Sequence, residues 1–154
     1  MISFPIAPWS FVIRPVNSDD LPAFTAYWND LEAREPKYHG STLAEMRAMY
    51  SDREAAWYLA QMLTPDGHLD LIIGNLDVGK VADDGLAQCE LNVSLDARGH
   101  GVGRALYHVM VHEALAAGAT TLRLMPHTRS TALIAFLERR GFTTERRFWG
   151  MRLP

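Results

Sequence analysis

The stretch Arg98-Gly99-His100-Gly101-Val102-Gly103-Arg104 lies between a strand-like run and a helix-like run of the chain. Glycine has no Cβ, so a segment rich in it can adopt positive φ angles and approach a ligand closely. The N-terminus of a helix presents backbone N–H groups that attract an anion. Arg98 and Arg104 flank these glycines. The spacing therefore fits either a pyrophosphate-binding loop or a tight turn from a strand into a helix.

Two better-known glycine patterns are excluded. Residues 74–80 read G-x-x-x-x-G-K, but Val81 stands where a P-loop needs Ser or Thr to hold magnesium. The dinucleotide fingerprint G-x-G-x-x-G fails in both registers, because Arg104 and Leu106 occupy its last glycine position. Nucleotide hydrolysis and Rossmann-type dinucleotide binding are thus disfavoured.

The rest of the chain predicts one α/β (α+β) domain over residues 1–154, with elements in the order βαα–βββ–αβαβ. Turn residues at 64–67 and 83–85 separate consecutive strand-like runs, which favours a largely antiparallel sheet. Periodicity and turn signals place strands at 11–16, 56–63, 69–77, 86–95, 120–125 and 142–151. Helices are expected from Ser18, from Thr42 with Glu45 as a capping box, and over 101–117 and 128–140.

Composition narrows the class further. Hydrophobic residues make up 48% and charged residues 21% of the 154 positions, which is typical of a globular protein. No apolar run approaches the roughly 20 residues that span a bilayer, so no membrane association is expected. Cys89 is the only cysteine, which excludes an internal disulfide and favours a reducing, cytoplasmic location.

Charge divides the chain into two unequal parts. Residues 1–96 hold 6 Lys+Arg and 15 Asp+Glu, a net charge of −9, whereas residues 97–154 hold 9 Arg and 3 Glu, a net charge of +6. Arginine suits phosphate because its planar fork binds oxyanions bidentately. A solvated surface explains such a bias equally well. Nucleic-acid binding is a weaker interpretation, since neither a helix-turn-helix pattern nor an aromatic stacking sheet is present.

The residues resemble the GNAT acyltransferase superfamily. Arg98-x-x-Gly101-x-Gly103 is similar to its acetyl-CoA signature [Q/R]-x-x-G-x-[G/A], and residues 93–98 are similar to its V-x-P-x-x-R approach, with Leu95 in place of proline. Residues 136–142 are similar to its C-terminal helix-to-strand signature. The two signatures lie about 40 residues apart in the family's order, and the likeness in element order covers nearly the whole chain.

The resemblance implies acetyl-CoA as cosubstrate and a role for each matched position. The loop would hold the coenzyme A pyrophosphate, mainly through backbone N–H groups, with Arg98, Gly99, His100, Gly101, Val102, Gly103 and Arg104. The strand end Leu91-Asn92-Val93 would diverge from the next parallel strand near Leu124 and pair with the pantetheine arm. Ser130 stands where the family often has a pantetheine-binding Asn. His100 either touches phosphate or fills a permissive position.

One departure from the family concerns the leaving group. Leu137 stands where the family often has the Tyr that protonates the coenzyme A thiolate, and leucine donates no proton. Another group or water then supplies the proton, or the chain is a non-catalytic acyl-CoA-binding or sensor domain. Tyr107 is the nearest substitute phenol in the sequence.

Glu90 is the candidate catalytic base. It alternates with the apolar residues Cys89 and Leu91 on its strand, so its side chain points away from the core. An amine attacks only when deprotonated, and a carboxylate or a water chain from it can take that proton. A surface carboxylate is the alternative explanation. No metal is expected, because His108 and His112 have helical i, i+4 spacing but no evident third ligand.

These observations predict an acetyl-CoA-dependent N-acetyltransferase that works by direct transfer. The acceptor would be a small-molecule or peptide amine, and the negative charge of residues 1–96 would favour a cationic one. No nucleic-acid partner is expected. The segment 147–151 could form an edge strand that pairs with a second copy, which makes a homodimer possible.

Overall fold

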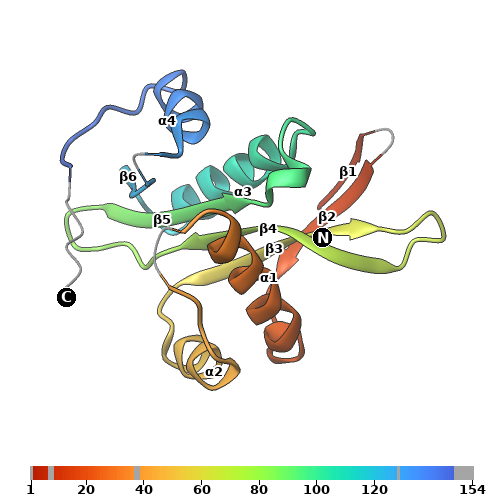
Figure 1. The fold of residues 1–154 in the computed structure, drawn as a ribbon. Coiled ribbons are helices and arrows are strands. Elements are labelled where there is room, and N and C mark those ends of the chain that lie inside the picture. The colour runs from red at the N-terminus through yellow and green to blue at the C-terminus, as the bar shows by residue number, and fades with distance from the viewer. Residues whose placement is uncertain (1, 7–8, 37–38, 128, 148–154) are drawn as a thin grey trace.

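The computed structural model describes residues 2–6, 9–36, 39–127 and 129–147. Its centre is one six-stranded sheet with the strands in sequence order (Figure 1). The strands are β1 (Ile2–Ile6), β2 (Trp9–Pro15), β3 (Ala56–Leu63), β4 (Leu69–Val78), β5 (Leu86–Val93) and β6 (Thr121–Leu124). The helices are α1 (Leu21–Arg34), α2 (Leu43–Asp52), α3 (Val102–Ala116) and α4 (Thr131–Glu138), with short 3-10 helices η1 (Ser18–Asp20) and η2 (Leu95–Ala97).

The largely antiparallel sheet is confirmed. Strands β1 to β5 pair antiparallel with their neighbours, and only β5 and β6 are parallel. The predicted turns at 64–67 and 83–85 join these antiparallel strands. Gly67 and Gly85 both have the positive φ that such tight turns require. The parallel pair needs a crossover, and α3 provides it.

Each face of the sheet carries its own apolar core. Helix α3 packs on one face through fully buried residues such as Val102, Leu106 and Met110. Helices α1 and α2 cover the other face through Leu21, Phe24 and Met46. Figure 1 shows α1 and α2 on the opposite side of the sheet from α3. Side chains that alternate along a central strand therefore meet different helices.

Local capping explains where the N-terminal helices begin. The predicted capping box of α2 is present: the Thr42 hydroxyl accepts from Glu45 N at 3.2 Å, and Glu45 Oε2 accepts from Thr42 N at 2.7 Å. The first helical segment is capped one residue earlier than predicted. Asn17 rather than Ser18 accepts from Asp19 N, at 2.9 Å, because Ser18 already belongs to η1.

One strand was missed. No strand was predicted over residues 2–6, which form β1 and include Pro5. Proline is tolerated on an edge strand, and β1 is the edge of the sheet.

One predicted strand, over 142–151, is wrong for its first part. Residues 142–147 form no strand; Phe142 packs against the α3 core and the five residues after it are all polar. Residues 148–151, which include most of the proposed pairing edge, lie outside the described residues.

The boundaries of two other elements differ from the prediction. Helix α4 begins at Thr131 rather than at 128, and β5 ends at Val93 because residues Leu95–Ala97 form η2.

Within the described ranges, no helix is long and apolar enough to cross a bilayer.

Candidate active site

The site begins where β5 and β6 separate. Their parallel pairing runs from Leu86↔Thr121 to Cys89↔Leu124 and goes no further. The predicted divergence near Leu124 is therefore present, and β5 continues to Val93 with an open edge. A narrow cavity lies at this point, lined by residues of β5, β6 and α4.

Backbone direction shows which groups face that open edge. Gln88 O accepts from Gly79 N at 2.8 Å and Ser94 N donates to Ile73 O at 2.9 Å, so even-numbered residues of this stretch bond to β4. The N–H and C=O of one strand residue point to the same neighbour, and successive residues alternate. Leu91 and Val93 thus direct their backbone groups to the open edge. Asn92, predicted to bind with them, directs its backbone to β4 instead.

The glycine loop forms the N-terminus of α3. Gly101 is its N-cap residue with φ 85°, a conformation that favours glycine. The first intrahelical bond runs from Ala105 N to Gly101 O, so the N–H groups of Val102, Gly103 and Arg104 have no acceptor within the helix. The first turn holds no acidic residue but contains Arg104, whose charge adds to the positive end of the helix dipole. Backbone and side chain together make this terminus attractive to an anion.

The remaining loop residues have distinct surroundings. Val102 is fully buried in the α3 core, so only its backbone is available to a ligand. Gly99 also has positive φ, at 78°, and the space where a Cβ would stand is empty. A Cβ on Gly103 would meet Val93 Cγ2 at 3.6 Å, which puts the helix start beside the end of β5. His100 Nδ1 lies 2.9 Å from the backbone oxygen of Arg98.

Arg98 is bound within the protein. Its Nη1 and Nη2 donate to the two carboxylate oxygens of Glu35 at 2.9 and 2.5 Å, and its Nε donates to Val93 O at 3.1 Å. The Glu35 carboxylate raises the pKa of Arg98 above its usual value. The guanidinium therefore joins the end of α1 to the end of β5.

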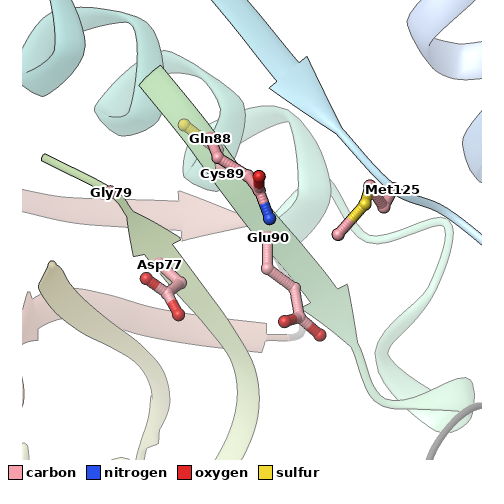
Figure 2. A pocket seen from close by; sticks show the side chains of 6 residues that line it. All are labelled: Asp77, Gly79, Gln88, Cys89, Glu90 and Met125. Atoms are coloured by element: carbon pink, nitrogen blue, oxygen red, sulfur yellow. The ribbon is translucent and has the colours of Figure 1, made fainter. Parts of the chain in front are cut away.

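Two carboxylates face each other across β4 and β5. Asp77 and Glu90 are register partners and, by the alternation of the ladder, a hydrogen-bonded pair with Cα atoms about 5.5 Å apart. Figure 2 shows both carboxylates on the same side of the strands, away from the Cys89 thiol. They line a cavity of about 240 Å³ together with Gly79, Gln88, Cys89 and Met125.

This carboxylate pair has perturbed electrostatics. Burial, and then the negative charge of Glu90, raises the pKa of Asp77 to about 7. Asn92, 5% exposed, donates through Nδ2 to Glu90 Oε1 at 3.0 Å. One amide thus orients Glu90, whereas Asp77 retains its proton to near-neutral pH.

Tyr27 of α1 completes this polar group. Its hydroxyl donates to Oδ1 of the buried Asn75 at 3.3 Å. Burial raises the pKa of Tyr27; the Arg98 charge opposes that rise and the Glu90 charge adds to it. The phenol therefore lies within electrostatic reach of both the loop and the carboxylate pair.

Leu137 is buried, as a packing residue would be, and offers no proton. Tyr107 is held in an aromatic cluster: its ring makes edge contacts with Phe136 and Phe142, with centroids 5.7 and 6.5 Å apart, and the Arg140 guanidinium lies 5.1 Å from its centroid.

Ser130, predicted to contact the pantetheine arm, is the half-buried N-cap residue of α4, and its side chain makes no capping bond. Its hydroxyl remains available to a ligand.

Metal-ligating groups are not assembled in the described part of the chain, where no three His, Cys, Asp or Glu side chains come together. His108 and His112 are exposed on α3.

Sequence reasoning missed Asp77, Asn75, Tyr27 and Glu35. A signal existed for the first two: Asn75 and Asp77 alternate with apolar residues in a strand, which places both on one face. No local signal marks Tyr27 or Glu35, because each acquires its partner only when α1 packs on the sheet.

Several solved structures share this fold. An N-acetyltransferase from Staphylococcus aureus Mu50 is 20% identical and aligns with a TM-score of 0.73 over 88% of this chain and 85% of that one. A ribosomal-protein-alanine N-acetyltransferase from Brucella melitensis is 21% identical, with a TM-score of 0.68 over 84% and 83%. A putative acetyltransferase from Acinetobacter baylyi ADP1 is 14% identical, with a TM-score of 0.76 over 92% and 83%.

No curated protein matches the sequence significantly. The sequence model of the acetyltransferase (GNAT) family matches residues 16–142, which include the sheet from β3 to β6, the glycine loop and all four helices. The match confirms the resemblance inferred from Arg98-x-x-Gly101-x-Gly103 and residues 136–142. The chain therefore belongs to the acetyltransferase (GNAT) family.

Proposed function

We propose that this protein is an acetyl-CoA-dependent N-acetyltransferase that transfers the acetyl group directly to an amine. One observation carries the proposal: four consecutive residues of β5, Glu90 to Val93, face both the open edge of the strand and the cavity. Leu91 and Val93 turn backbone groups to the open edge, whereas Glu90 reaches the cavity on the α1 and α2 side. A thioester held along the edge and an amine held in the cavity would meet at this stretch.

The cosubstrate side relies on backbone. The open edge of β5 offers the pantetheine amides the hydrogen bonds of a missing strand. The N–H groups at the start of α3 then receive the pyrophosphate, and Arg104 adds a positive charge. Ser130 lies at the start of α4, whose Leu133 lines the cavity between β5 and β6.

The acceptor side relies on carboxyl side chains. Asp77 and Glu90 both line the 240 Å³ cavity, and its other described lining residues are uncharged. Such surroundings favour a cationic acceptor over an anionic one. An amine arrives mostly protonated at neutral pH, so a negative site attracts the form in solution and a base then generates the nucleophile.

The transfer balances as follows. Glu90, oriented by Asn92, takes a proton from the ammonium directly or through water. The amine nitrogen attacks the thioester carbonyl, a C–N bond forms, and the C–S bond breaks. The product amide nitrogen loses its extra proton to water, and the thiolate gains a proton from water. Glu90 releases its own proton to solvent before the next turnover. A thiol has a pKa near 8.5, so its thiolate is a tolerable leaving group without a protein acid.

A panel of amines with acetyl-CoA, followed by detection of the free thiol, tests the proposal. The panel should include diamines, amino acids, amino sugars and peptides with a free N-terminus. We expect thiol release that depends on the amine, matched by an acetylated product in mass spectra. Tight acetyl-CoA binding without product for any amine would favour the non-catalytic acyl-CoA-binding alternative.

A further inference from the structure

We propose that Glu35, at the end of α1, is a positioning residue for coenzyme A. By holding Arg98 against the end of β5, it fixes the loop that presents the N-terminus of α3. Arg98, although it stands in the acetyl-CoA signature, then acts as a brace rather than as a phosphate ligand. The inference rests on the proposed coenzyme A site.

The contacts of Arg98 leave little of its guanidinium for a ligand. Three of its five N–H groups donate within the protein: one from each terminal nitrogen to Glu35, and that of Nε to Val93 O. The Glu35–Arg98 pair is also partly shielded, since the two side chains are 29% and 41% exposed. Bidentate geometry of this kind fixes orientation as well as distance.

The bond to Val93 closes a ring around the loop. Val93 is the last residue of β5 and Arg98 lies five positions later, three before the N-cap Gly101. Holding Val93 O against Arg98 therefore fixes where the chain leaves the sheet and where it enters α3. The backbone N–H groups are then oriented before a ligand arrives, which lowers the ordering cost of binding.

A second ion pair holds the same segment. Arg34, adjacent to Glu35, donates to both carboxylate oxygens of Asp96 at 2.7 and 3.0 Å. Asp96 belongs to η2, between β5 and Arg98. Arg34, the last residue of α1, and Glu35, its C-cap residue, thus bind two residues of the segment between β5 and α3, Asp96 and Arg98.

Electrostatics alone argues against a carboxylate at this place. Glu35 adds negative charge beside a site for a polyanion, and Coulomb repulsion should weaken binding. Removing that charge should therefore tighten coenzyme A binding if Glu35 has no positioning role. A positioning role predicts the opposite sign, which makes the test decisive.

The test measures coenzyme A affinity by calorimetry for wild type, Glu35→Gln and Glu35→Ala. We expect affinity to fall roughly 2- to 10-fold, the ordering cost of one or two side chains, and more for Ala than for Gln. Asp52→Asn is the matched control: it removes the same charge from the exposed end of α2, outside both ion pairs, and its affinity should equal or exceed that of wild type. Unchanged or tighter binding in both Glu35 variants would overturn the inference.

Arg98→Ala and the double variant Glu35→Ala/Arg98→Ala complete the cycle. If the pair acts as one brace, the double variant should bind no more weakly than Arg98→Ala alone. Additive losses would instead show that Glu35 and Arg98 contribute independently, which would contradict the brace. Hydrogen exchange of the free protein gives a readout without ligand: amides of 94–104 should exchange faster in Glu35→Ala than in Asp52→Asn.

The outcomes separate this inference from the proposed function. If wild type binds coenzyme A but the Glu35 variants do so equally well, only the brace fails. If wild type binds no coenzyme A, the proposed function fails and the brace fails with it.

Discussion

The two halves of the site are built from different materials. On the cosubstrate side, the open edge of β5 and the start of α3 present main-chain groups, and Gly101 with φ 85° shapes them. On the proposed acceptor side, Asp77 and Glu90 present side chains from β4 and β5. The first half depends on how the backbone runs, and the second on which side chains lie opposite one another.

The two kinds of site should respond differently to substitutions. A main-chain site tolerates most side-chain changes, because any residue supplies an N–H group, but it cannot tolerate a change that moves the backbone. In a site made of side chains, one substitution removes the reacting group even though the backbone stays in place.

Glu90→Gln should lower kcat by about 10²- to 10⁴-fold, because it removes the general base while keeping shape and the Asn92 contact. The loss should shrink as pH approaches the pKa of the acceptor amine. Steady-state kinetics at several pH values measure it, with Glu54→Gln, an exposed carboxylate paired to Lys80, as the control for charge alone. A kcat within twofold of wild type at pH 7 would remove Glu90 from the chemistry.

Gly101→Val should weaken acetyl-CoA binding at least tenfold, about 1.4 kcal/mol. A β-branched side chain is strained at positive φ, and its methyl groups would occupy space where the pyrophosphate would approach the backbone. Gly118→Val is the control, since Gly118 has φ 88° in open space just after α3. Both variants should lose stability, but only Gly101→Val should lose affinity in calorimetry. Equal affinities in the two folded variants would place the phosphates elsewhere.

Asp77→Asn should change how stability depends on pH. Folding raises the pKa of Asp77 from 3.8 to about 7, so between these values the folded state binds more protons than the unfolded state. The free energy of unfolding of wild type therefore falls, through this group, as pH rises across that window.

The Asn variant loses that dependence. Between pH 5 and pH 8 the wild type should lose on the order of 3 kcal/mol of stability, about 1.4 kcal/mol for each pH unit up to the folded pKa, and the variant should not. Denaturant unfolding at pH 5 and pH 8 measures the difference. A variant that tracks wild type at both pH values would show that Asp77 ionises freely.

Tyr107→Phe should have the smallest effect, less than tenfold on kcat, or under about 1.4 kcal/mol of barrier. The ring packs between Phe136 and Phe142, and phenylalanine keeps those contacts. Rates from pH 6 to 10 test it. A hundredfold loss, with the high-pH decline of wild type abolished, would show that this phenol protonates the thiolate.

Short-range signals in the sequence were enough to predict most of the strands and helices. Turn residues at 64–67 and 83–85 enforced antiparallel hairpins, and the capping box of Thr42 and Glu45 started α2 where expected. These signals act over a few residues, so they survive without tertiary context. The glycine loop belongs to the same class, since its positive φ angles and its helix start are local properties.

The remaining features depend on contacts between segments that lie far apart in the sequence. The edge strand β1 formed despite Pro5 because β2 pairs with it, and residues 142–147 formed no strand although an apolar pair follows them in the chain. Asp77 meets Glu90 through strand register, and Glu35 meets Arg98 only because α1 ends beside β5, 63 positions away in sequence. Local composition reports what one segment can adopt; cross-strand pairs and ion pairs between distant segments depend on how those segments pack.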